Sequence, residues 1–565
     1  MLEKIKKLMA GDRIGHVLYK VVNEILKEFP NKDTYVLESG VTPSGKIHIG
    51  NFNDMVITFA VSQILEFKGY NTMPILVFDS RDPFRKAPVF APDEFKRKEQ
   101  EFFGKPLDEI EDPWGCHENF AEHFIVLFLE SLEDYGIRLI VYRAKEVHSN
   151  PIYIDNLIKV LKNREKVREI LNDVRSKAGH KNLYPKNWIP YRPKCENCGR
   201  MDERVIPLEV SEDGRYVRYK CLHCGHEGVA DVTKMQGKPP WRIDWPLRWV
   251  TFKVNFEPMG KDHMAAGSSY HTARALLEQF FKVKPPVSLF YDFVYWIPPE
   301  DVERKTKLAF SGRKGIGWST SEWLRYAPPE VLKYLILRRQ VADIRRESLK
   351  HIDFSPLDVP SYVDAYDKHE MSFYDYMEGK LKLDPADEDR LVVTYVLSQV
   401  DWKKIRRKRP FRVPYDDMIE VALWMESIEE GIKMLRRMKK LPPNIPKEYL
   451  EDAKRRLIMV SNWVHDYYKP QLPNISEILE KLDEKQKEAL KILIPKFLEI
   501  PINELTMDKI RESVKGVADD LGLSTRDIYK AFYIAVLGKE SGPPVVRLFR
   551  KDFSRKHLEK LIEFL

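Results

Sequence analysis

The sequence predicts an α/β protein in which a parallel sheet, interrupted by two insertions, is followed by an all-helical C-terminal part. Three observations lead to this prediction. Up to about residue 325, short apolar runs typical of strands alternate with helical patterns, an order that favours a parallel sheet covered on both faces. Beyond that point only helical apolar spacing remains. One insertion carries four of the five cysteines as two C-x-x-C pairs, which is metal-binding spacing.

The expected elements follow in chain order. Strands are expected at 35–40, 73–78, 138–142 and 287–291, a long apolar-rich helix at 52–67, and insertions around 83–123 and 185–235. Later helices are expected at 331–339, 389–398, 418–438, 450–468, 484–498 and 525–536, with proline-rich joints such as 441–446. The expected domains are a body at 1–325, a connecting segment at 326–385 and a helical domain at 386–565.

Composition narrows the class of protein. A chain of 565 residues with 43% apolar and 32% charged residues is expected to form several soluble domains. Its net charge of +8 includes basic runs at 403–409, 436–440 and 454–456, which are either solvated helix faces or contacts to a polyanion. There is no apolar stretch of membrane-spanning length and no signal-peptide core, and the paired thiols suit a reducing compartment. A cytoplasmic location without membrane contact is therefore expected.

The first expected strand leads through a short loop into the long helix. Residues 42–45 are typical of a tight turn, and Gly50 allows a ligand to approach the backbone closely. A helix N-terminus offers free N–H groups to a phosphate, and His48 stands where it can donate to a phosphate oxygen. Taken alone, the same pattern also suits an ordinary turn with a surface histidine.

The loop resembles a known signature. His48-Ile49-Gly50-Asn51, preceded by Thr42-Pro43-Ser44-Gly45, is similar to the HIGH motif of class I aminoacyl-tRNA synthetases, in the form HIGN. Four ordered segments resemble class I lysyl-tRNA synthetases in particular: 38–45, 112–124, 241–249 and 260–270. The resemblance implies a Rossmann-type catalytic domain with zinc-binding insertions and a C-terminal helical cage that holds the anticodon. It also implies a ligase that activates L-lysine with ATP and Mg²⁺ and transfers it to the 3′ end of tRNA-Lys.

The resemblance also implies roles for individual residues. His48 and Asn51 are expected to be catalytic. The expected ATP-binding residues are Thr42, Pro43, Ser44, Gly50, Gly260, Asp262 and Ser311. Independently, a lysine substrate requires a carboxylate for its ammonium and apolar or aromatic walls for its methylenes. Candidates for this pocket are Glu38, Trp241, Trp245 and Tyr291, to which the resemblance adds Gly40 and His263.

A second signature of the family, the mobile KMSKS loop, is altered in this chain. Aligning residues 311–315 with it places Lys314 on the final lysine, where a cation stabilises the departing pyrophosphate. The first lysine and the methionine of the signature are replaced by Ala309 and Phe310. Either the catalytic role is shared by Lys307, Arg313 and Lys314, or activation is impaired.

Two groups of side chains have metal-ligand spacing. The first is a zinc-ribbon pattern of Cys195, Cys198, Cys221 and Cys224, for which His223 and His226 are competing ligands. Four thiolates leave no open position, so a structural role is expected. The second group is Asp112, Cys116, His117 and His123. Its residue types suit a second tetrahedral zinc, which the resemblance favours, although a core cysteine beside surface histidines has the same spacing.

Two other functions remain open at this point. A glutamyl- or glutaminyl-type enzyme shares the helical cage, but its pocket needs an arginine for the substrate carboxylate. A non-catalytic tRNA-binding paralogue is suggested by Ala309.

Overall fold

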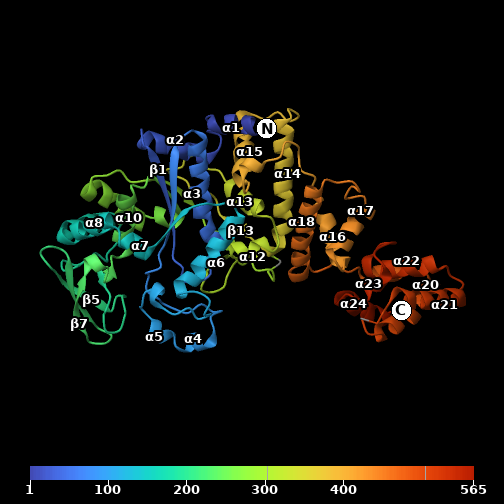
Figure 1. Ribbon diagram of the computed structural model, residues 1–565. Coiled ribbons are helices and arrows are strands. Elements are labelled where there is room, and N and C mark those ends of the chain that lie inside the picture. The colour runs from blue at the N-terminus through green and yellow to red at the C-terminus, as the bar shows by residue number, and fades with distance from the viewer. Residues whose placement is uncertain (302, 503) are drawn as a thin grey trace. The chain divides into compact units, whose positions relative to one another are not determined.

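The computed structural model describes all residues except 302 and 503. They form two compact units, Met1–Tyr415 and Asp416–Leu565 (Figure 1). Each unit contains its own apolar core. The three-part functional division expected from the sequence remains a proposal.

A five-stranded parallel sheet forms the centre of the first unit, in the order β10-β9-β1-β2-β3. Its strands are β1 (Thr34–Val41), β2 (Asn71–Phe78), β3 (Ile140–Arg143), β9 (Phe256–Gly260) and β10 (Val287–Tyr291). The predicted parallel sheet is confirmed. Strand β9 is not among the expected elements, because its run Phe-Glu-Pro-Met-Gly contains acidic, proline and glycine residues that are depleted in strands.

Helices pack on the parallel sheet. Helix α3 (Ile49–Phe67) packs on β1, β2 and β9. Helices α10 (Trp241–Phe252) and α11 (Ser269–Leu276, extended by a π-helical turn Leu277–Phe281) build an apolar cluster with Val36 and Val77 of the sheet. Helices α1 (Leu2–Ala10) and α2 (Val17–Glu28) contact α3, and α6 (Phe120–Asp134) contacts the sheet through Phe128, whose ring lies 6.4 Å from that of Phe78 between centroids. The carboxyl ends of β1, β2 and β9 therefore meet at one edge, where open α/β sheets bind ligands.

Two insertions leave the sheet. The first contains α4 (Asp93–Arg97), α5 (Glu99–Phe102) and a 3-10 turn (Leu107–Glu109). The second contains α7 (Ala144–His148), α8 (Pro151–Lys162), α9 (Arg164–Lys177), β4 (Arg192–Pro193), β5 (Val205–Val210), β6 (Tyr216–Cys221), β7 (Glu227–Asp231), a 3-10 turn (Val232–Lys234) and β8 (Gly237–Lys238). Strands β5, β6 and β7 form an antiparallel sheet, and β4 pairs with β8.

The rest of the first unit is mainly helical but contains one more sheet. Strand β11 (Val294–Trp296) pairs with β12 (Leu308–Ala309) and β13 (Ile352–Phe354). The expectation of helices alone after residue 325 is therefore wrong at β13, whose three residues are too few to leave a periodic signal. The helices are α12 (Thr320–Leu324), α13 (Pro329–Leu337), α14 (Val359–Met377) and α15 (Pro385–Ser398), with 3-10 turns at Pro356–Asp358 and Trp402–Lys404.

In the second unit, all regular elements among the described residues are helices. The single helix expected at 418–438 is wrong. It is interrupted at residues 425–427 because the Ser427 side chain accepts from the backbone N–H of Glu430 and starts a new helix. The helices are α16 (Tyr415–Trp424), α17 (Ile428–Arg437), α18 (Lys447–Asp466), α19 (Ile475–Lys481), α20 (Glu484–Glu499), α21 (Met507–Leu521), α22 (Thr525–Leu537), α23 (Val545–Leu548) and α24 (Asp552–Ile562).

A search of the described residues for a helix both long and apolar enough to cross a membrane finds none.

Candidate active site and metal centres

The loop after β1 ends at the N-terminus of α3, where two side chains cap the helix reciprocally. His48 Nδ1 accepts from the backbone N–H of Asn51, and Asn51 Oδ1 accepts from the backbone N–H of His48, both at 3.3 Å. Nδ1 therefore carries no hydrogen, so the proton of the neutral ring lies on Nε2. Burial lowers the pKa of His48 to about 4. The ring is a neutral donor beside the free N–H groups of α3.

A hairpin made by residues 309–317 rests on this β1–α3 loop. Ser311 and Ile316 exchange two backbone hydrogen bonds of 3.0 and 3.1 Å. A Cβ added at Gly312 would lie 2.1 Å from the carbonyl oxygen of Lys46, and one added at Gly45 would lie 2.9 Å from the backbone nitrogen of Arg313. Only glycines permit so close an approach. The structure thus brings together the two segments that the sequence marks as signatures.

The altered residues of the hairpin have different surroundings. The ring of Phe310 packs edge-on against that of His48, with centroids 5.4 Å apart. Lys314 is exposed at the turn of the hairpin. Lys307 lies outside the hairpin, and its Nζ pairs with the Asp353 carboxylate of β13 at 2.8 Å. Of the two lysines, Lys314 is therefore the one carried by the hairpin.

The loop after β9 provides a second polar segment. Gly260 pairs with Tyr291 of β10, and a Cβ at Gly260 would lie 2.6 Å from Asp262 Oδ1, so the glycine lets that carboxylate fold back. Burial raises the pKa of Tyr291 well above its usual range, and the carboxylate of Asp54 on α3 adds to this effect.

In the β1–α3 loop, the backbone N–H of Ser44, next to Pro43, donates to the carbonyl oxygen of Thr42 at 2.9 Å.

Residues of β1, β9 and α10 lie together in a cluster that we call the acidic pocket. It comprises Glu38, Gly40, Trp241, Trp245, Arg248 and Glu257. Arg248 Nη1 lies 3.9 Å from Glu38 Oε1 and 3.8 Å from the position of a Cβ at Gly40. The guanidinium also lies over the Trp241 ring, 5.2 Å from its centroid. Trp245 stacks on Trp241 with centroids 5.0 Å apart. The structure therefore brings together Glu38, Gly40, Trp241 and Trp245, four of the six residues expected around the substrate.

The neighbouring loop contributes a further aromatic contact to this pocket. The ring of His263 lies 4.9 Å from that of Trp245, between centroids. Burial lowers the pKa of His263. Trp245 Nε1 in turn donates to Glu257 Oε2 at 3.0 Å. The β9 loop and the acidic pocket thus share one wall.

Sequence reasoning missed several charged residues that surround this pocket. Arg248 pairs with Asp79, which follows β2, and with Asp244 at 3.2 Å. Lys238 Nζ lies 2.7 Å from Asp82 and 3.4 Å from Asp244. Asp82 also accepts from the Thr42 hydroxyl at 3.1 Å. The available signals were the position of Asp79 and Asp82 just after a buried strand and the i,i+4 spacing of Asp244 and Arg248.

The pKa values of this network follow from its burial. Burial raises the pKa of Asp79 to about 6, against the opposing effect of Arg248. Burial would also raise the pKa of Asp244, but Arg248, His148 and Lys238 hold it well below its usual range. Among the described residues, carboxyl groups outnumber basic side chains in this network. Arg248, Lys238 and His148 face five carboxyl groups: Glu38, Asp79, Asp82, Asp244 and Glu257. The pocket therefore favours a cationic ligand.

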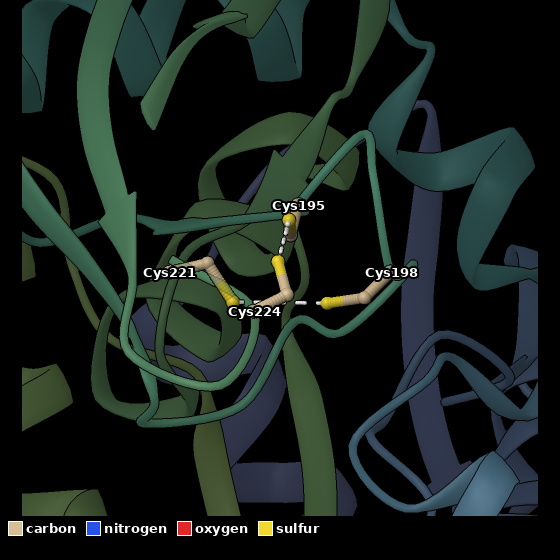
Figure 2. A group of neighbouring side chains, drawn as sticks. All are labelled: Cys195, Cys198, Cys221 and Cys224. Atoms are coloured by element: carbon tan, nitrogen blue, oxygen red, sulfur yellow. Dashed lines mark hydrogen bonds between the residues drawn. The ribbon is translucent and has the colours of Figure 1, made fainter. Parts of the chain in front are cut away.

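The four ribbon cysteines converge on one point (Figure 2). The Sγ atoms of Cys195 and Cys224 are 3.7 Å apart, as are those of Cys198 and Cys221, and all four lie within 4.8 Å of one another. A tetrahedron with Zn–S bonds of about 2.3 Å has S···S edges of about 3.8 Å, so the group fits this ion. His226 is engaged elsewhere, 2.7 Å from Glu196.

The second group also fits a tetrahedral metal. Cys116 Sγ lies 3.1 Å from His117 Nδ1 and 3.3 Å from His123 Nδ1, and His123 Nδ1 lies 3.3 Å from Asp112 Oδ1. The Asp112 carboxylate also accepts from the backbone N–H groups of residues 114, 116 and 117 at 3.1, 2.9 and 2.8 Å. Trp114 stacks on His123 at 4.0 Å between centroids. These contacts orient the ligand atoms toward one another.

Comparisons with known proteins agree with these features. Residues 16–399 match the family described as tRNA synthetases class I (K), and residues 459–550 match the family described as anticodon binding domain. A lysine--tRNA ligase of Methanocaldococcus jannaschii is 35% identical over 94% of this chain and 97% of its own length. Lysine--tRNA ligases of Methanococcus maripaludis and Pyrococcus horikoshii are each 33% identical, over 91% and 93% of this chain and 93% and 94% of their own.

Proposed function

The chain belongs to the family of class I tRNA synthetases of the lysine type, and on this premise we propose how its site acts as a lysine--tRNA ligase. The enzyme activates L-lysine with ATP to lysyl-adenylate, releases pyrophosphate, and transfers the lysyl group to the 3′ end of tRNA-Lys. This role implies a cytoplasmic location. The 459–550 segment serves as the anticodon-binding part of the second unit.

The acidic pocket is the observation that carries the assignment of the substrate. Glu38 is fully buried, and neither of its carboxyl oxygens has a hydrogen-bond partner among the described residues. An unpartnered buried carboxyl group is costly, so a ligand that supplies a cationic donor is strongly favoured. The ε-ammonium of lysine provides such a donor, and the faces of Trp241 and Trp245 suit its methylene chain. Lysine is the substrate that this pocket accommodates best.

The β1–α3 loop is placed to hold the phosphates of ATP. The Nε2–H of His48 and the free N–H groups at the start of α3 can donate to phosphate oxygens, where charge develops during attack by the lysine carboxylate. Lys314 on the hairpin is placed to accompany the departing pyrophosphate, with Ser311 beside it. Gly260 and Asp262 are proposed to bind the ribose of ATP. Gly50, which has no side chain, lets the phosphates lie close to the backbone. Mg²⁺ neutralises phosphate charge when ATP is bound.

The rival glutamyl or glutaminyl assignment requires an arginine free to bind a substrate carboxylate. The arginine of this pocket, Arg248, is already paired with Asp79 and Asp244. The side-chain carboxylate of a glutamate substrate would add to the excess of carboxyl groups in the pocket, so the pocket disfavours glutamate. The hairpin, in contact with the β1–α3 loop, also argues for retained catalysis rather than a binding paralogue.

Zinc is proposed for both metal groups. Cys195, Cys198, Cys221 and Cys224 offer four soft ligands and no open position, so this zinc would hold the ribbon together. Asp112, Cys116, His117 and His123 would bind a second zinc that fixes the first insertion. No chemical step of the reaction requires either ion.

Pyrophosphate exchange tests the proposal directly. The purified full-length protein should exchange labelled pyrophosphate into ATP with lysine and with none of the other standard amino acids. Exchange with glutamate would replace the substrate assignment. The absence of exchange with every amino acid, together with retained binding of tRNA-Lys, would support the non-catalytic alternative.

A further inference from the structure

Two acidic side chains lie side by side under helix α10. Leu37 of β1 pairs with Phe256 of β9, so the next residues, Glu38 and Glu257, occupy adjacent positions on neighbouring strands with their side chains on the same face. Both are buried, with exposed fractions of 0% and 6%. Like charges placed directly opposite each other in a sheet repel, and burial strengthens the repulsion.

The partners of the two carboxyl groups differ. Glu257 accepts hydrogen bonds from the indole N–H groups of Trp245 and Trp249. Glu38 accepts none from the described residues, and its nearest cation, Arg248, lies 3.9 Å away and is held by two aspartates. A buried carboxylate without a donor is the less stable form of the group. Protonation of this pair is therefore the expected state of the empty pocket.

The charged groups that face the pair agree with this view. Burial, followed by the charge of Glu257, raises the pKa of Glu38 well above its usual range, and only Arg248 opposes this. Burial likewise raises the pKa of Glu257 to about 7, against its two indole donors and Arg248. The other groups near the pair are Asp79 after β2, Asp244 on α10 and Asp54 on α3, all of them acidic.

Beside Glu38, on the same face of β1, the chain carries no side chain. Two residues along the strand, Gly40 has no side chain, and a Cβ there would have Val77 O at 3.6 Å and Arg248 Nη1 at 3.8 Å. The indole rings of Trp241 and Trp245 form the adjoining wall. A cationic group that reaches Glu38 would lie near these rings, and no donor among the described residues is hydrogen-bonded to either carboxyl oxygen.

We propose that the empty pocket holds a proton on the Glu38–Glu257 pair, and that the ε-ammonium of lysine displaces this proton when it binds. This inference rests on the proposed function and specifies the proton that is released when lysine binds. The O–H bond of the carboxyl group breaks, the proton passes to water, and the resulting carboxylate pairs with the ammonium, which keeps its own three hydrogens. Each lysine bound therefore releases one proton from the protein.

The exchange makes lysine affinity depend on pH. Below the pKa of the pair, the proton competes with the ammonium, so the apparent Kd should rise about tenfold for each unit by which pH falls. Above that pKa the Kd should be constant. The neutral isostere 6-hydroxynorleucine displaces no proton, so any binding of it should show no such slope.

Calorimetric titration of the full-length protein with lysine tests this inference. At each pH between about 6 and about 9, the experiment compares two buffers that both hold that pH, one of low and one of high ionisation enthalpy. We expect the difference in heat to indicate close to one proton released per lysine at the acid end and none at the alkaline end. Equal heats in both buffers at every pH would overturn the inference while leaving lysine as the ligand. If lysine does not bind at all, the proposed function itself fails.

A substitution locates the proton. Glu257→Gln keeps an oxygen that accepts the two indole hydrogens but removes the charge beside Glu38, so the pH at which proton release begins should fall by one unit or more. The matched control is Glu203→Gln, which changes an exposed carboxylate of the ribbon and should leave the pH profile unaltered. An unchanged profile in a well-folded Glu257→Gln protein would refute the role of the pair. If this variant does not fold, the buffer comparison on the unmodified protein still decides.

Discussion

The role of His48 can be separated into its two nitrogens. In the structure, Nδ1 caps α3 by accepting from Asn51, whereas Nε2 carries the hydrogen assigned to ATP phosphate. His48→Ala removes both. Loss of the cap should lower the free energy of unfolding by about 1 kcal/mol, and loss of the donor should slow adenylate formation by about 10²–10³-fold. Lysine affinity should change little, because the acidic pocket is unaltered.

Two further substitutions distinguish these effects. His48→Asn places an acceptor near the position of Nδ1, so it should restore the melting temperature but not the rate. His48→Gln places an amide N–H near the position of Nε2, so it should recover part of the rate. Single-turnover adenylate formation and thermal unfolding are the two measurements. Because burial lowers the pKa of His48 to about 4, the rate constant at saturating lysine should show no titration of this residue above about pH 5. A His48→Asn protein that activates lysine at the normal rate would refute the assignment of Nε2.

Three other predictions follow from the same structure. Lys314→Ala should reduce kcat for pyrophosphate exchange by two orders of magnitude or more, about the effect of one lost charge-stabilising donor, whereas Lys307→Ala should leave it nearly intact because Lys307 pairs with Asp353; a large loss in Lys307→Ala would show that the cationic role is shared. Glu38→Gln should abolish detectable lysine binding in calorimetry while ATP binding persists, and retained binding would exclude Glu38 as the ammonium partner. Metal analysis should find two zinc ions per chain and one in Cys116→Ser, whereas one zinc in both proteins would remove the second site and leave the ribbon.

Local signals predicted much of this molecule. The ribbon cysteines are recognisable because the two members of each pair are only three positions apart in the chain. The pairing of β5 with β6 then places the two pairs next to each other. Most strands of the large sheet and the helices that follow have the apolar spacing of their class. The break at residues 425–427 was missed because apolar spacing continues through it, and the cap at Ser427 decides the boundary.

Most of the acidic pocket could not be predicted from the sequence. Glu38 could be proposed from the needs of a lysine substrate, but Glu257 becomes its neighbour only through the pairing of β1 with β9, which are more than two hundred residues apart in the chain. Similarly, the residues around Asp79 in the chain do not reveal that its carboxylate forms an ion pair with Arg248. Contacts set by long-range register leave no periodicity in a single sequence.

The close approach of the hairpin to the β1–α3 loop limits which substitutions the two segments accept. Gly45 and Gly312 lie on opposite sides of the same contact, and a methyl group on either would push the two segments apart. Neither position accepts a side chain without opening that contact, whereas the hairpin positions 309, 310 and 313 differ from the signature of the family. The hairpin should therefore tolerate changes of the side chains around Gly312 better than the addition of one at Gly312 itself.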